Sequence, residues 1–156
     1  MAIFEVSEML KVAIVDEEAG IKFYEILAGK VKNSTLKERL MSIANQEKIH
    51  MAIFQQMLKE VKDVKIREEY KGQHENYMKA LMNSRAFPDT NLAIKKANSA
   101  SSSECLDIAL RLEKDAILFY EELMKFVPNT YAKQVGEVME EERNHLTELL
   151  ELKANF

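Results

Sequence analysis

The sequence predicts an all-α protein, a four-helix bundle in which two antiparallel helix hairpins are joined by a long crossover containing an extra helix. Three observations indicate this fold. Four long segments repeat apolar residues in steps of three and four, which marks the buried stripe of a packed helix. Glycine and proline number only 4 and 2 in 156 residues, whereas proteins rich in strands and tight turns use more of both. Finally, the connections between the segments differ greatly in length.

The first two segments form the first predicted hairpin. Their stripes are Leu10, Ala13, Glu17, Gly20, Tyr24, Leu27 and Val31, then Leu36, Leu40, Ile43, Glu47, His50, Phe54, Met57 and Val61. Thr35 and Glu38 have the spacing of a capping box, which favours a helix start at this point. The connection over residues 32–34 is short, so the two helices are expected to run antiparallel.

The last two segments form the second predicted hairpin. Their stripes are Leu106, Ala109, Glu113, Ala116, Tyr120, Leu123 and Val127, then Tyr131, Val135, Val138, Glu142, His145, Leu149, Leu152 and Phe156. Ser101 and Glu104 fit a second capping box. Residues 128–130 begin with proline and are expected to separate the two helices by a short turn.

The crossover between the hairpins spans about forty residues, 62–102. A connection of this length is seldom structureless inside a compact domain. Residues 66–84 are predicted to be helical, and residues 87–90 and 98–103 are predicted to be loops. The whole chain, 1–156, is expected to form one domain, since this length suffices for one hydrophobic core.

The two hairpins repeat each other in sequence. The sixteen residues from Glu17 match those from Glu113 at seven positions with an offset of 96, and Glu47 and His50 fall on Glu142 and His145 with an offset of 95. The hairpins are therefore expected to be related by a pseudo-twofold axis. The repeat also predicts that Glu17→Ala and Glu113→Ala weaken metal binding to a similar degree.

Polar residues interrupt each apolar stripe near its middle: Glu17, Glu47, His50, Glu113, Glu142 and His145. In each hairpin they are equidistant from the turn, roughly 20–25 Å along the helices, so all four helices bring them to one level. Burying four carboxylates together is costly without compensation, and two divalent cations would balance their charge. Glu-x-x-His places both side chains on one helix face. The sequence therefore predicts a two-metal site.

Neighbouring side chains leave some roles open. The acids Glu18 and Glu141 adjoin the stripe, but their repeat equivalents are Lys114 and Gln46, which favours Glu17 and Glu142 as ligands. Tyr24 and Tyr120 are expected either to pack in the core or to act on the site, by hydrogen-bonding its ligands or as redox-active side chains.

Composition excludes several other classes of protein. The net charge is −4 and no basic block occurs, so neither nucleic acid nor a membrane surface is an expected partner. The amino-terminal residues lack the positive region of a signal peptide, which favours a cytoplasmic protein. A single cysteine, Cys105, excludes a disulfide within one chain.

On these stripe residues the sequence resembles the ferritin-like superfamily, and rubrerythrin-type di-iron carboxylate domains in particular, over residues 7–61 and 103–152. The resemblance implies that Glu47 and Glu142 bridge two irons, that Glu17 and Glu113 are terminal or bridging ligands, and that His50 or His145 binds each iron. Manganese or zinc are the expected substitutes. The implied activity is reduction of hydrogen peroxide or dioxygen; the alternatives are a ferroxidase that stores or buffers iron, and a structural bundle with a vestigial site.

The sequence also departs from rubrerythrins. It has one cysteine where a rubredoxin domain needs four, so an external electron-donor protein such as a rubredoxin is expected. It has Ala116 where rubrerythrins carry an extra carboxylate, which brings its ligand set closer to that of bacterioferritin. Its crossover is longer than in either group, which favours a homodimer or small homo-oligomer over a cage.

Overall fold

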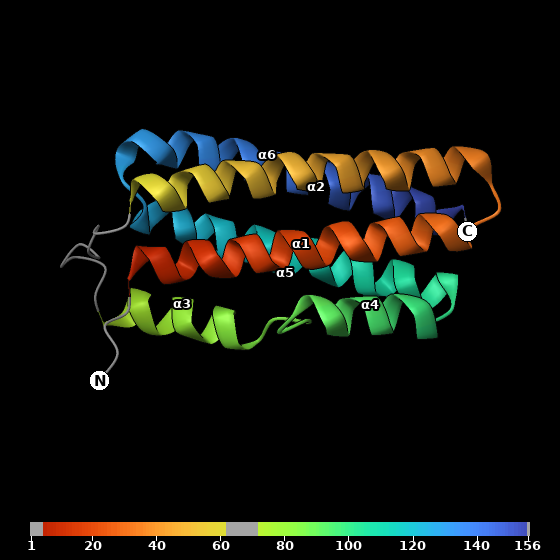
Figure 1. Cartoon of the computed structure of the whole chain (residues 1–156), viewed down its shortest axis with the longest axis horizontal. Coiled ribbons are helices and arrows are strands. Elements are labelled where there is room, and N and C mark those ends of the chain that lie inside the picture. The colour runs from red at the N-terminus through yellow and green to blue at the C-terminus, as the bar shows by residue number, and fades with distance from the viewer. Residues whose placement is uncertain (1–4, 62–71, 156) are drawn as a thin grey trace.

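The structure is a computed structural model that describes residues 5–61 and 72–155. Within these residues the helices are α1 (Val6–Lys30), α2 (Ser34–Glu60), α3 (Gln73–Asn83), α4 (Thr90–Ser99), α5 (Ser102–Phe126) and α6 (Asn129–Ala154). The four long helices, α1, α2, α5 and α6, lie side by side as a bundle, and α3 and α4 follow one another along one side of it (Figure 1). The predicted bundle with its long crossover is confirmed.

The two hairpins form as predicted, with one correction at a helix start. Helix α1 packs along α2 and α5 along α6. Ser101 accepts a hydrogen bond from the backbone N–H of Glu104, as the second capping box predicts. The other predicted capping box, at Thr35 and Glu38, was wrong. Helix α2 is capped by Asn33, whose side chain accepts a hydrogen bond from the backbone N–H of Leu36. Asparagine is among the best N-cap residues, so the helix begins before Thr35.

The described part of the crossover contains two helices, and only one of them was predicted. Helix α3 falls inside the predicted range 66–84, of which residues 66–71 lie outside the described part of the chain. Helix α4 was not predicted; it overlaps the two predicted loops only at residues 90, 98 and 99, and α5 begins at Ser102, inside the second of them. Asp89 caps the first turn of α4 by accepting from Leu92 N–H. Its buried side chains, Ala93 and Ala97, are small. They make a weak apolar stripe, which is why the sequence did not indicate this helix.

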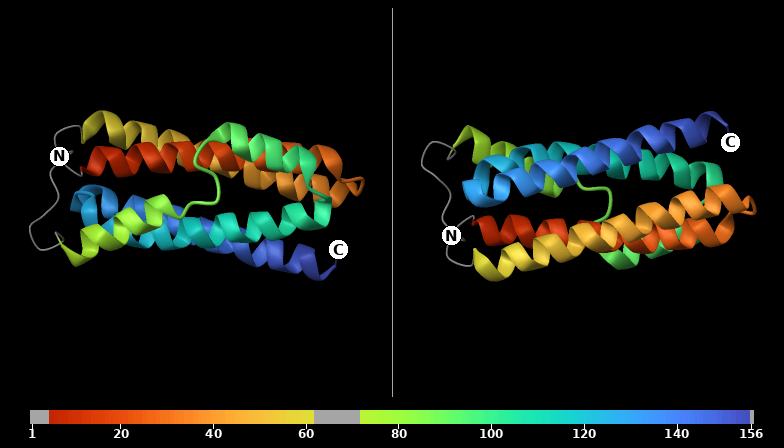
Figure 2. Two further views of the ribbon diagram at one scale, coloured as in Figure 1. Left: turned by 90° about the horizontal axis from the view of Figure 1, so that it is seen from below. Right: turned by 90° about the horizontal axis from the view of Figure 1, so that it is seen from above.

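The crossover covers the side of the bundle formed by α1 and α5. Helix α4 packs on α1 and α3 packs on α5, and the link between them passes across the bundle near its middle (Figure 2). This link, residues 84–89, joins the ends of two helices that lie on different hairpins. The crossover therefore brings its own backbone to the level of the polar stripe residues.

Apolar side chains form two clusters, one toward each end of the bundle. One contains residues 6–13 of α1 and the carboxyl-terminal half of α2, including Phe54 and Met57. The other contains residues 19–28 of α1 and the amino-terminal half of α2, including Leu40 and Ile43. On every long helix the polar stripe residues lie between these two clusters. They are thus enclosed by apolar layers on both sides.

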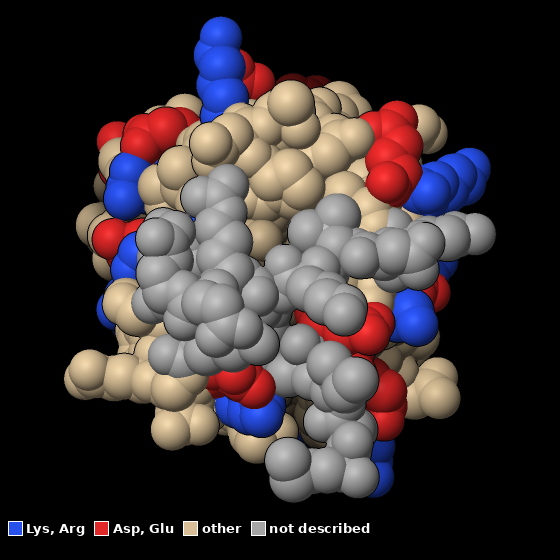
Figure 3. Space-filling model, turned by 90° about the vertical axis from the view of Figure 1, so that its left-hand side faces the viewer, with Lys and Arg blue, Asp and Glu red and all other residues tan. Residues whose placement is uncertain are grey.

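The end of the molecule where α1 begins carries charged side chains of both signs (Figure 3). Viewed from the end where α1 begins, described Lys and Arg side chains are interspersed with Asp and Glu around the rim (Figure 3). Among the described residues, none of the helices has the length and apolarity that a bilayer crossing requires.

Candidate metal centre

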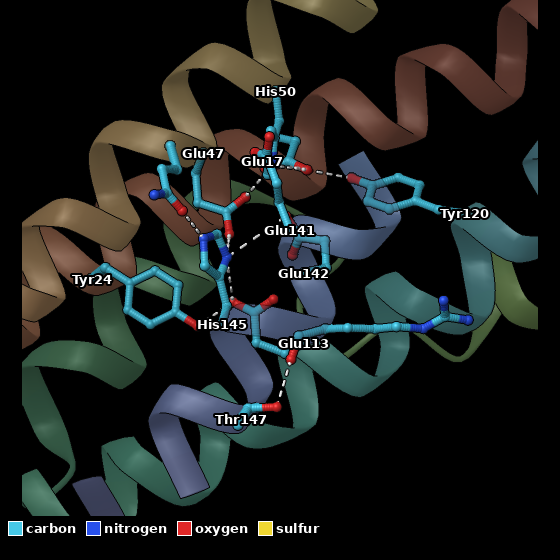
Figure 4. Close-up of polar contacts among 12 residues, drawn as sticks. Glu17, Tyr24, Glu47, His50, Glu113, Tyr120, Glu141, Glu142, His145 and Thr147 are labelled. Carbon is cyan, nitrogen blue, oxygen red and sulfur yellow. Dashed lines mark hydrogen bonds and ion pairs between the residues drawn. The ribbon is translucent and has the colours of Figure 1, made fainter. Parts of the chain in front are cut away.

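The structure brings all six polar stripe residues together in the middle of the bundle (Figure 4). They are Glu17 on α1, Glu47 and His50 on α2, Glu113 on α5, and Glu142 and His145 on α6. Each side chain is buried, with 1–3% of its residue surface exposed. Helical spacing explains the arrangement, because each hairpin delivers its polar residues at the same distance from its turn.

The six residues form two overlapping groups of four. Within each group, one donor atom from every residue lies within 4.8 Å of the others. The first group is Glu17, Glu47, His50 and Glu142; the second is Glu47, Glu113, Glu142 and His145. Glu47 and Glu142 belong to both groups. This arrangement has the donor types and the spacing to hold two cations that share two carboxylates.

Both histidines direct Nδ1 toward the carboxylates. The Nδ1 atom of His50 lies 2.7 Å from Glu142 Oε1 and 3.6 Å from Glu17 Oε1. The Nδ1 atom of His145 lies 3.1 Å from Glu47 Oε1 and 3.7 Å from Glu113 Oε1. The two rings stack loosely, with centroids 5.9 Å apart. Nδ1 is therefore the nitrogen of each ring that is placed to bind a metal.

The other ring nitrogen of each histidine faces away from the four buried glutamates of the cluster. His50 Nε2 contacts the Glu141 carboxylate, and His145 Nε2 contacts the side-chain oxygen of Gln46. Both partners are acceptors, so each keeps a hydrogen on Nε2, and loss of the Nδ1 proton on metal binding would leave the Nδ1 lone pair available. The sequence used Gln46 and Glu141 only to choose ligands and did not predict these contacts.

The two tyrosines hydrogen-bond carboxylates of the opposite hairpin. Tyr24 on α1 donates to Glu113 Oε1 at 2.5 Å, and Tyr120 on α5 donates to Glu17 Oε1 at 2.5 Å. Both rings are also fully packed in the apolar clusters. Of the alternatives left open by the sequence, core packing and hydrogen bonding to the predicted ligands Glu113 and Glu17 are both observed. A redox role for these tyrosines stays a prediction.

Several buried polar atoms in the cluster have no hydrogen-bond partner: Glu17 Oε2, Glu113 Oε2, Glu142 Oε1 and His50 Nδ1. His50 Nδ1 and Glu142 Oε1 are close, but their orientation does not make a hydrogen bond. Native proteins leave few such atoms unsatisfied, and each one calls for an explanation. Coordination of a cation would satisfy all four, so the donor set fits a metal site.

The protonation of the metal-free cluster also fits a metal site. Burial raises the pKa of Glu47 and of Glu142, and the neighbouring carboxylates raise both further. Burial acts to lower the pKa of His50 and of His145, but the surrounding carboxylates outweigh it and the pKa of each is raised. Without cations the cluster therefore retains protons at pH values where exposed groups would release them. Divalent metals would replace these protons.

A pocket reaches the cluster from the side covered by the crossover. Four of the six stripe residues line it, together with the link residues Arg85, Ala86 and Phe87, and with Asp16, Asp115 and Ala116. Arg85 forms an ion pair with Asp16, at 2.9 Å between Nη1 and Oδ1. Burial raises the pKa of Asp16 to about 7 although Arg85 opposes the shift. The sequence missed this pocket because Arg85 lies in the crossover, outside any repeat.

Comparisons with known proteins agree with this architecture. The family model described as Rubrerythrin matches residues 8–153. The chain is also similar to a crystal structure described as a ferritin-like diiron-carboxylate protein from Thermotoga maritima. That match has a TM-score of 0.71 and 30% sequence identity, and covers 99% of this chain and 97% of the other. A search of curated proteins gives no match.

Proposed function

This chain belongs to the rubrerythrin family, and we propose that it is a di-iron oxidoreductase that reduces hydrogen peroxide, or dioxygen, to water. One observation carries the proposal. The buried carboxylates and histidines form two interlocking groups that share Glu47 and Glu142. A single metal, or a cluster of merely structural carboxylates, requires no such sharing.

We assign the ligands from membership of these groups. Glu47 and Glu142 bridge the two metal positions, because each belongs to both groups. Glu17 and His50 complete the first position, and Glu113 and His145 complete the second. Oxygen-rich donors with one imidazole per metal suit iron or manganese. Membership of the rubrerythrin family favours iron as the redox-active metal.

Two ferrous ions would supply the two electrons that convert one hydrogen peroxide molecule and two protons to two water molecules. Reduction of one dioxygen molecule to two water molecules takes four electrons and four protons, so the external donor would supply the other two electrons. The chain contributes the surroundings. Tyr24 and Tyr120 hold the carboxylates of Glu113 and Glu17 in fixed orientations. The apolar clusters on either side limit water, and the pocket beside Arg85 admits a small oxidant.

We propose that a separate protein returns the electrons. The only cysteine, Cys105, is buried, and an iron site of the rubredoxin kind needs four cysteine ligands. We therefore propose a rubredoxin or a similar small electron carrier as the donor. A homodimer or small homo-oligomer is the proposed assembly.

The test begins with an anaerobic titration of metal-free protein with Fe²⁺. We expect saturation at two ions per chain, followed by faster reoxidation of the loaded protein by peroxide than by dioxygen. Glu47→Ala should abolish stoichiometric binding, because that carboxylate belongs to both groups. Glu18→Ala, which removes an exposed neighbour of Glu17, is the matched control and should bind two ions. Saturation near zero in the unaltered protein would refute the proposal.

A second candidate is a protein that oxidises and buffers Fe²⁺. The carboxylate of Asp115 on the pocket lining favours it, because a negative charge there would attract cations toward the site. This function predicts iron uptake far beyond two ions per chain under air and a large hollow oligomer. Iron analysis and sedimentation of the loaded protein distinguish it from the first candidate.

A further inference from the structure

The contacts outside the six ligands break the internal symmetry of the site. Position 46 corresponds to position 141 in the sequence repeat, and each contacts the histidine of the opposite hairpin. The equivalent contacts are chemically different, since Glu141 offers His50 a carboxylate and Gln46 offers His145 a neutral amide. The six inner residues show no such difference in type.

This difference changes how strongly each imidazole binds a metal. An Nε2–H that donates to a carboxylate makes the ring a more basic ligand, and hydrogen bonds to charged acceptors are stronger than those to neutral ones. The Glu141 carboxylate also places a negative charge on the far side of the His50 ring from the metal position. An amide oxygen fixes the same tautomer without that charge.

Resting on the two-metal site proposed above, we propose that its metal positions are inequivalent: the position completed by Glu17 and His50 binds a divalent metal more tightly than the position completed by Glu113 and His145. Glu141 is the positioning residue responsible. Loss of such outer partners typically costs about 10–100-fold in metal affinity. The side chain of Glu141 is 49% exposed and solvent weakens its effect, so we expect a difference of about 10-fold.

The inequivalence has a direct consequence for loading. A chain with one metal ion carries it mainly at the position of His50. The inequivalence also replaces the expectation from the repeat that Glu17→Ala and Glu113→Ala weaken binding to a similar degree. Glu113→Ala keeps Glu17 and His50 and should retain the tighter site.

The test uses Co²⁺ and two single-position backgrounds. Glu113→Ala retains Glu17 with His50, and Glu17→Ala retains Glu113 with His145. Binding is measured by competition with a chelator and followed by the visible absorption of bound Co²⁺. We expect Kd to be about 10-fold lower in the Glu113→Ala protein.

Exchange of the outer partners then assigns the cause. Adding Glu141→Gln to the Glu113→Ala protein should raise Kd about 10-fold, and adding Gln46→Glu to the Glu17→Ala protein should lower it by a similar factor. Glu140→Gln is the control. It removes the same charge as Glu141→Gln, but from an exposed neighbouring side chain that contacts neither histidine. An equal effect of Glu140→Gln would mean that long-range charge, rather than the contact, sets the affinity, and would overturn the assignment.

A spectroscopic measurement separates this role from a structural one. The exchangeable Nε2 proton of a histidine bound to Co²⁺ through Nδ1 gives a strongly shifted NMR signal. In the otherwise unaltered protein, Glu141→Gln should move the His50 signal and leave that of His145 in place, with unchanged helix content. Equal Kd values in the two backgrounds with no response to Glu141→Gln would overturn the inequivalence alone. Absence of Co²⁺ binding in the unaltered protein and in both backgrounds would overturn the metal site itself.

Discussion

Tyr120 on α5 donates a hydrogen bond to Glu17 on α1, so a residue of the second hairpin orients a carboxylate of the first. Tyr120→Phe removes this donor and leaves the buried carboxylate oxygen of Glu17 without the hydrogen bond. We expect the metal-free protein to lose about 1–3 kcal/mol of unfolding free energy, and metal affinity to fall about 10-fold or more. Urea unfolding and Co²⁺ competition measure the two effects.

The internal repeat supplies a comparison for this variant. Tyr24→Phe removes the equivalent hydrogen bond to Glu113 and should have a similar effect on stability. Phe23, adjacent in sequence, has no hydroxyl and packs in the same cluster, so Phe23→Leu reports the cost of altered packing alone. If Tyr120→Phe left both stability and affinity unchanged, the hydrogen bond would have no orienting role.

Stability of the metal-free protein should fall as the pH rises. The folded pKa values of Glu47, Glu142, His50 and His145 are raised above the unfolded ones, so folding takes up protons there. The stability from these protons is fully present below the unfolded pKa of each group and is lost as the pH rises toward the folded value. For the two carboxylates the loss begins above about pH 4.5. The lowered pKa of Glu113 does not offset this loss, because its contribution to stability is already complete above the unfolded pKa of that group.

Thermal unfolding between pH 5 and 8 tests this expectation. The midpoint of the metal-free protein should decrease across the range. Added Mn²⁺ should raise the midpoint more at pH 8 than at pH 5, since the metal displaces protons from its ligands. A midpoint that rose steadily with pH without metal would show that the buried carboxylates are ionised at little cost.

Arg85→Ala should destabilise the protein in a pH-dependent way while leaving two metal ions per chain. Arg85 is the ion-pair partner of the half-buried Asp16, whose pKa is about 7 with the arginine present. Removing Arg85 raises this pKa further. We expect a loss of about 1–3 kcal/mol at pH 8 and a smaller loss at pH 6, where Asp16 can keep its proton.

The control for Arg85 is Arg111→Ala. Arg111 lies on α5 with a mostly exposed side chain, and its contact with Asp115 is long, 3.8 Å. Exposed pairs of this kind contribute at most about 1 kcal/mol. Equal pH profiles for the two variants would contradict a specific role for the Arg85–Asp16 pair.

The corrected start of α2 gives a fourth prediction. Asn33→Ala removes the side chain that caps the helix, and should cost about 1 kcal/mol of unfolding free energy. Thr35→Ala lies inside the helix and should cost less. Chemical unfolding of both variants distinguishes the observed cap from the one that the sequence indicated.

The hairpins and the convergence of the six polar residues could be predicted because both follow from helical periodicity. Glu47 and Glu142 stand out as polar exceptions on regular apolar stripes. Helix α4 could not be predicted in the same way, since it packs through alanines. Arg85 reaches the pocket through tertiary folding of the crossover, which has no periodic signal. The contacts of Gln46 and Glu141 lie one residue off the stripe, where sequence patterns indicate only solvent.

Each group of four donors draws on both hairpins. The first takes three residues from α1 and α2 and Glu142 from α6; the second takes Glu47 from α2 and the rest from α5 and α6. Neither half of the chain can complete a position alone. A metal ion bound at either position would thus act as a removable cross-link between the halves. Chelation should let the hairpins separate before either one unwinds, so apolar side chains between them should become accessible to solvent while the helix content stays unchanged.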